Sequence, residues 1–205
     1  MLSKIAYLCD IIVEPLKHRV MEKRKVSIDI AKANFFAIAL LIGAAIVFGI
    51  PFLMIWGKTQ PHWPDQLSMS SNPWSLLWVL LAYLLGIVIH ELIHGITWSF
   101  FAPNGWRSIS FGVIWKMVTP YCHCDDPMRR RGYLWGAMMP CIVVGVIPAI
   151  ISLLSGSLVC LVWGIFFISA AAGDIWMSWL LLKEKPGCLV LDHPNETAFY
   201  VFDEE

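Results

Sequence analysis

The sequence predicts an all-α membrane protein with four transmembrane helices, a short β-hairpin-like cytosolic loop and a small strand-containing C-terminal tail. The first observation is composition: 58% of the 205 residues are apolar and only 15% are charged. Soluble domains average about 45–50% apolar and about 25% charged residues, so a mean hydropathy of +0.67 excludes an ordinary soluble domain. The formal net charge is zero, which gives no basic field for nucleic acid. The other two observations are four long apolar stretches and one-sided positive charge.

Each of the four stretches is about as long as the roughly 20 apolar residues that cross a bilayer. They cover residues 34–56, 74–101, 134–154 and 158–182. Asn72-Pro73 supplies N-cap and first-turn signals for the second stretch, and Ser155-Gly156-Ser157 joins the last two as a tight hairpin. The chain therefore divides into a cytosolic N-terminal segment 1–33, a four-span membrane domain 34–182 and a cytosolic tail 183–205. Residues 5–16 are predicted to form either an interfacial helix or an ordinary lead-in.

Positive charge sets the predicted orientation. Fourteen of the 15 Lys and Arg residues lie in the N-terminal segment, in the loop between the second and third spans, or in the tail. Only Lys58 lies in the loop 57–73. Because cytosolic loops are enriched in Lys and Arg, both termini are predicted to be cytosolic, with the chain as an integral, multi-pass protein. Four of the six cysteines then face the reducing side and two lie in spans, so no disulfide framework is expected.

Two segments outside the spans favour strands. The loop 107–126 contains Ser108–Trp115, which is β-prone and partly alternating, and Thr119–Cys124, which could pair with it. The tail contains two further strand-like runs, Cys188–Leu191 and Ala198–Phe202, on either side of a predicted turn.

The second span contains three adjacent ionisable positions, which are costly at membrane depth and so indicate function. They are His90, Glu91 and His94, in the pattern His-Glu-x-x-His. Histidines at i and i+4 share a helix face, so both imidazoles can bind one zinc ion. Glu91 can then take a proton from a zinc-bound water. The alternative is a pair of core histidines bonded to neighbouring polar groups.

A catalytic zinc site needs a third protein ligand and one open position. One candidate is Asp174. The others are five residues of the loop 107–126: Cys122, His123, Cys124, Asp125 and Asp126. Asp174 is the only acidic residue of the fourth span, and at 1.5 Å per residue it lies about 12 Å from the cytosolic edge, against about 10 Å for His94. Matching depth favours Asp174 as the third ligand, with an Asp bonded to a neighbouring helix as the alternative.

The tract Cys122-His123-Cys124 looks like a metal site by composition. On a strand, however, Cys122 and Cys124 face one way and His123 the other, so the three side chains do not converge easily. We expect this loop to shape the site or to present an edge strand to a peptide.

These residues resemble two related groups of proteins. A His-Glu-x-x-His helix in the membrane, a β-prone loop and a later Gly-Asp span are similar to the site-two protease class of intramembrane zinc metalloproteases. A closer resemblance is to a bacterial family of small multi-span proteins described as putative zincin peptidases, and it covers roughly residues 74–202. It rests on His90–Gly95, Pro120–Cys124 with Pro127, Gly173-Asp174, and the tail from Leu191 to Val201.

The resemblance implies that His90, His94 and Asp174 hold Zn²⁺, with Glu91 as the base, and that the protein lies in a bacterial inner or plasma membrane. Ala172-Gly173-Asp174-Ile175 departs from the Asn-Pro-Asp-Gly or Leu-Asp-Gly of the site-two pattern. The leading hypothesis is a zinc-dependent intramembrane or membrane-embedded endopeptidase acting on a peptide or transmembrane protein. The alternative is a non-catalytic zinc-binding membrane scaffold or regulatory protein, whose site would be closed by a fourth protein ligand. A metal transporter is disfavoured because the outer halves of spans two and four offer almost no polar residues.

Overall fold

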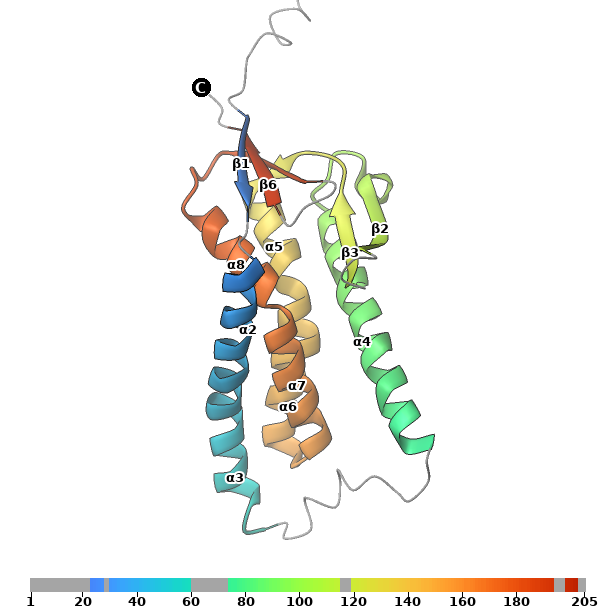
Figure 1. Ribbon diagram of the computed structural model, residues 1–205, viewed down its shortest axis with the longest axis vertical. Helices are drawn as coiled ribbons and strands as arrows, with labels where there is room; N and C mark the ends of the chain where they lie inside the picture. The colour runs from blue at the N-terminus through green and yellow to red at the C-terminus, as the bar shows by residue number, and fades with distance from the viewer. Residues whose placement is uncertain (1–22, 28–29, 60–73, 115–118, 194–197, 203–205) are drawn as a thin grey trace, which may run out of the picture.

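A computed structural model describes residues 23–27, 30–59, 74–114, 119–193 and 198–202 (Figure 1). Most of the described chain is helical. The helices run side by side, and the strands gather at one end of them, where α4 ends and α5 begins (Figure 1). The predicted mostly helical architecture, with strands in the loop and in the tail, is confirmed.

Three helical segments of the described chain are long and apolar enough to cross a membrane, judged by length and composition. They are Ala31–Trp56, Trp74–Ser99 and Arg130–Ser155. The first consists of α2 (Ile30–Ala44), a π-helical turn (Ala45–Gly49) and α3 (Ile50–Trp56). The second is α4 (Trp74–Ser99). The third consists of α5 (Arg130–Pro140), a second π-helical turn (Cys141–Val146) and α6 (Ile147–Ser155). Their ends lie within a few residues of the predicted ones.

The fourth predicted span is not one straight helix. It consists of α7 (Leu158–Ala170) and α8 (Ala172–Leu182), which are bent by 46° at Ala171 and pass the same criteria only as a pair. Ala171 has φ −76° and ψ 13°, and this ψ is far from the helical value of about −42°. The apolar pattern is continuous through 158–182, so it does not reveal the break.

Small residues allow the helices to pack closely. A Cβ added at Gly164 of α7 would lie 2.7 Å from the backbone nitrogen of Ala149 in α6, so only glycine permits this approach. The turn between these helices uses Gly156, whose φ of +73° favours glycine. Ser157 then caps α7 by accepting a hydrogen bond from the Cys160 backbone N–H at 3.3 Å.

The loop after α4 forms the predicted hairpin. β2 (Ile109–Ile114) and β3 (Thr119–Cys124) pair antiparallel, with Ile109 opposite Cys124 and Ile114 opposite Thr119. The hairpin lies beside the end of α4 (Figure 1).

The tail strands belong to a larger sheet than the sequence indicates. β5 (Leu189–Asp192) and β6 (Ala198–Phe202) pair antiparallel, and β1 (Lys23–Ser27) and β4 (Met128–Arg129) complete the strand order β1-β6-β5-β4. Buried side chains of this sheet pack with Trp98, Tyr133 and Leu181 from the ends of α4, α5 and α8. The sheet therefore ties the two ends of the chain to the helix ends. The predicted interfacial helix over 5–16 lies outside the described residues.

Candidate metal centre

Two of the four predicted site residues are buried histidines on α4. His90 and His94 are 7% and 4% exposed, on a helix whose other large apolar side chains are mostly exposed. They continue the face that begins with Gly86, against which Phe167 of α7 packs; a Cβ at Gly86 would lie 2.4 Å from the Phe167 ring. The small residue thus lets α7 approach the helix face that carries both imidazoles.

Asp174 comes from the bent part of the fourth span. It lies in the first turn of α8, directly after the break at Ala171. A carboxylate in the first helical turn is stabilised by the N-terminal end of the helix dipole. The bend therefore does two things: it starts a new helix at this depth, and it places an acidic side chain where that helix favours one.

The structure brings these three side chains together. Ligand atoms of His90, His94 and Asp174 all lie within 4.8 Å of one another, and among the described residues no other group of three or more His, Cys, Asp or Glu does so. His90 Nε2 lies 3.1 Å from Asp174 Oδ2, and His94 Nε2 lies 3.5 Å from Asp174 Oδ1. Residues 84 positions apart in sequence therefore share one site.

The hydrogen bonds of His94 indicate that this site suits a cation. His94 Nδ1 lies 2.9 Å from the Gly136 carbonyl oxygen, which can only accept, so Nδ1 carries the proton. In a neutral imidazole, Nε2 is then a lone pair that faces the Asp174 carboxylate. Two acceptors repel each other unless a proton or a cation lies between them. Donation of the second ring N–H to a backbone carbonyl is also the usual way in which a metal-binding histidine is oriented.

His90 also turns a ring nitrogen toward the carboxylate. Its Nε2 lies 3.1 Å from Asp174 Oδ2, while its buried Nδ1 has no hydrogen-bond partner in the described part of the chain. Two imidazoles and one carboxylate are also a known ligand set of catalytic zinc. The residues present therefore fit a zinc ion.

Glu91 lies beside these ligands, half-buried on α4. Its carboxylate lies next to the backbone of Cys122 in β3. The hairpin reaches this position because Gly95 has no side chain: a Cβ there would lie 2.6 Å from Phe111 and 3.3 Å from Cys122 Sγ. Gly95 thus allows the β2–β3 hairpin to lie against the helix next to Glu91.

The side chains of Cys122, His123 and Cys124 do not converge, as the strand alternation predicts, and none of them belongs to the metal-ligand group. Cys122 packs near Gly95, and Cys124 is buried in the core beneath the sheet. His123 instead faces two carboxylates, with Nε2 3.2 Å from Asp125 Oδ1 and Nδ1 3.7 Å from Asp192 Oδ2. Burial raises the pKa of the Cys124 thiol to about 11 and also raises the pKa of Cys122. Both thiols are therefore neutral near pH 7.

Sequence reasoning missed Asp192, a buried carboxylate at the end of β5. It accepts hydrogen bonds from the Tyr133 hydroxyl and from the Cys124 backbone N–H, the latter at 3.1 Å. Burial raises the pKa of this carboxyl. Asp192 thereby joins the tail sheet, the hairpin and α5 above the site. The available signal was an acidic residue directly after a buried strand, which is also typical of a turn.

The chain is mostly helical and has three or four candidate membrane-crossing helices. It carries a His-His-Asp ligand group next to a glutamate. A family model described as "Putative zincin peptidase" matches residues 83–189, which include all four site residues. The chain belongs to this family, whose name indicates a zinc-dependent peptidase. The comparisons with curated proteins and with solved structures found no match.

The ligand set predicts the effect of removing its carboxylate. Asp174→Asn keeps the size of the side chain but removes the charge that faces both imidazoles. We expect a loss of zinc affinity at least as large as the roughly 10–100-fold that follows removal of a residue that only orients a ligand. Metal content of the purified protein, measured by mass spectrometry after dialysis, tests this. Asp125→Asn, an exposed position that contacts Ser110 and His123, is the matched control and should keep its zinc. Equal zinc in the two variants would exclude Asp174 as a ligand.

Proposed function

We propose that this protein is a zinc-dependent endopeptidase that lies within a membrane. The single observation that supports this most is the convergence of His90, His94 and Asp174 beside Glu91, on helices apolar enough to span a bilayer. Three protein ligands leave one position of a tetrahedral zinc open, which is typical of catalytic rather than structural sites. Membership of the zincin peptidase family agrees with this assignment.

In this proposal each site residue has one role. His90, His94 and Asp174 hold the metal, and the Gly136 carbonyl orients His94 through Nδ1. Zinc bound there would polarise the scissile carbonyl and lower the pKa of a water. Glu91 accepts the proton of the attacking water and passes it to the leaving amine. The backbone of Cys122 lies next to the Glu91 carboxylate and would help to hold this base in position.

The substrate class follows from the surroundings of the site. A peptide bond must be exposed to reach zinc, so a transmembrane substrate has to unwind locally, and its freed backbone groups then need partners. The β2–β3 hairpin lies directly beside Glu91 and offers backbone groups for this purpose. We therefore propose a peptide or transmembrane protein as substrate.

The membrane orientation is part of the same proposal. The helix ends that carry the two sheets also carry the positively charged segments, such as Arg129–Arg131, so this end and both termini are assigned to the cytosol. A green fluorescent protein fused to the C-terminus should then fluoresce in a bacterial host, and an alkaline phosphatase fused at the same point should be inactive. An active phosphatase fusion would contradict the orientation.

Glu91→Gln tests the catalytic assignment. The amide cannot accept the proton of a water, so cleavage should fall by about 10²–10⁴-fold, the contribution of a general base, while zinc content stays that of the wild type. The readout is cleavage of fluorescent casein and of a set of single-span transmembrane peptides in detergent. Glu184→Gln, which changes a glutamate paired with Arg24 outside the site, is the control and should keep its activity.

Unchanged cleavage by Glu91→Gln, or a purified wild-type protein without zinc, would overturn the peptidase proposal. A non-catalytic zinc-binding scaffold is the second candidate. It predicts a fourth protein ligand, and the described ligand group holds three residues.

A further inference from the structure

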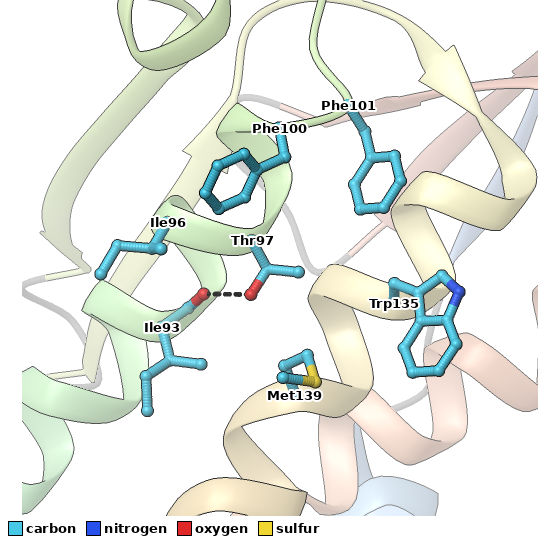
Figure 2. Close-up of a pocket in the computed structure, with 7 residues that line it drawn as sticks. All are labelled: Ile93, Ile96, Thr97, Phe100, Phe101, Trp135 and Met139. Carbon is cyan, nitrogen blue, oxygen red and sulfur yellow. Dashed lines mark hydrogen bonds between the residues drawn. The ribbon is translucent and has the colours of Figure 1, made fainter.

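A groove opens between α4 and α5 (Figure 2). Its volume is about 500 Å³, which is within the range of roughly 300–1,000 Å³ for small-molecule sites. Seven side chains line it: Ile93, Ile96, Thr97, Phe100 and Phe101 at the end of α4 and just after it, and Trp135 and Met139 from α5.

The groove offers almost no polar surface to an occupant. The Thr97 hydroxyl, its one polar side chain apart from the indole, donates to the Ile93 carbonyl at 2.8 Å, as the dashed line in Figure 2 marks. The backbone around it is helical and bonded internally. An unwound peptide would bring N–H and C=O groups that find no partner here, at a cost of about 1–3 kcal/mol each for buried groups. The part of an occupant that enters the groove is therefore an apolar chain.

The groove is open to the side. Phe100 is 80% exposed and Trp135 is 56% exposed. In a membrane, both side chains would face lipid. Tryptophan is enriched at the level of the headgroups, and Trp135 lies near the strand-bearing end of α5. A molecule from the lipid phase can thus enter the groove without passing through the protein.

A positive charge lies above the groove. Arg131 precedes Trp135 by one helical turn and Met139 by two, so the three residues share one face of α5. Arg131 is exposed, and no hydrogen bond or ion pair of its side chain occurs within the described residues. The face therefore presents an apolar groove below and an uncompensated guanidinium above it, toward the headgroup level.

From this arrangement we infer that the groove binds an anionic phospholipid, with one acyl chain between Ile93 and Met139 and the phosphate at Arg131. The inference rests on the membrane location in the proposed function, and it does not depend on peptidase activity. Arginine suits this role because its guanidinium pairs with phosphate through two parallel hydrogen bonds.

Two other occupants fit less well. A substrate helix is about 10–12 Å wide with its side chains, so it would cover the groove rather than enter it. In a two-fold dimer built on this groove both copies would bring an Arg131 to the contact, and the groove lining has no acidic side chain to pair with either of them. An acyl chain with a phosphate matches both the apolar lining and the charge.

The test uses the full-length protein, delipidated in detergent and supplied with one lipid at a time. Dioleoyl phosphatidylglycerol and dioleoyl phosphatidylcholine share acyl chains and differ in net charge. Native mass spectrometry should show that phosphatidylglycerol is retained about fivefold more, which is the factor that one arginine contributes toward an anionic lipid surface. A phosphatidylglycerol with a diazirine on its acyl chain should crosslink to residues 93–101 and 135–139.

Arg131→Gln tests the contact with the lipid headgroup, and Thr97→Phe tests the site for the acyl chain. Arg131→Gln should lower phosphatidylglycerol retention to the level of phosphatidylcholine, whereas Lys58→Gln removes an exposed charge after α3 and should change nothing. Thr97→Phe fills the groove and should abolish crosslinking at residues 93–101 and 135–139. Val88→Phe makes a comparable change at an exposed position of α4 outside the groove and should leave that crosslinking intact.

Equal retention of the two lipids, or a wild-type response in Arg131→Gln, would overturn the headgroup assignment. Undiminished crosslinking in Thr97→Phe would overturn the acyl-chain site. A dimer that Thr97→Phe abolishes would assign the groove to a second copy instead. Zinc content, measured on the same samples, keeps the two proposals separate: protein with zinc but no retained phosphatidylglycerol contradicts only the lipid site, and the reverse contradicts only the peptidase.

Discussion

The Asp174 carboxylate facing two imidazoles is the interaction on which the site depends. On apolar helices a buried carboxylate carries a desolvation penalty of several kcal/mol. Here the Asp174 oxygens face one ring nitrogen of each histidine. The proton on His94 Nδ1 is fixed by the Gly136 carbonyl, so Nε2 faces Asp174 as a lone pair in the neutral ring. A cation between His94 Nε2 and the Asp174 carboxylate removes the repulsion between these two acceptors. Zinc is the cation that the ligand set and the family indicate.

Other features of the fold bring Asp174 next to the two histidines. The bend at Ala171 starts a new helix just before Asp174. On α4, glycines leave room for the neighbouring segments to pack closely. Gly86 admits α7 below the site, and Gly95 admits the β2–β3 hairpin above it. The same end of the bundle is held by the four-stranded sheet, in which the N-terminal strand pairs with the last one. The site is therefore assembled by parts of the chain that are far apart in sequence.

Much of this organisation could be predicted from the sequence, because it is local. The spans follow from long apolar stretches, the hairpin from β-prone runs, and the pair His90 and His94 from helical spacing. Asp174 stood out because it is the only acidic residue of its span. The bend at Ala171, the strands β1 and β4, and the buried Asp192 could not be predicted in this way. The two strands and the contacts of Asp192 depend on pairing between distant segments, which leaves no periodic pattern in the chain. The bend lies within a continuous apolar stretch, so the pattern does not reveal it either.

X-ray absorption spectroscopy at the zinc edge, on the purified wild-type protein, identifies the side chains that bind the metal. An open His-His-Asp site gives four nitrogen or oxygen ligands at about 2.0–2.1 Å, with the multiple scattering of two imidazoles. No sulfur ligand should appear, because Cys122 and Cys124 lie outside the ligand group. A shell at about 2.3 Å would identify a thiolate ligand. That result, or a signal from a third imidazole, would contradict the open His-His-Asp site and favour a closed structural one.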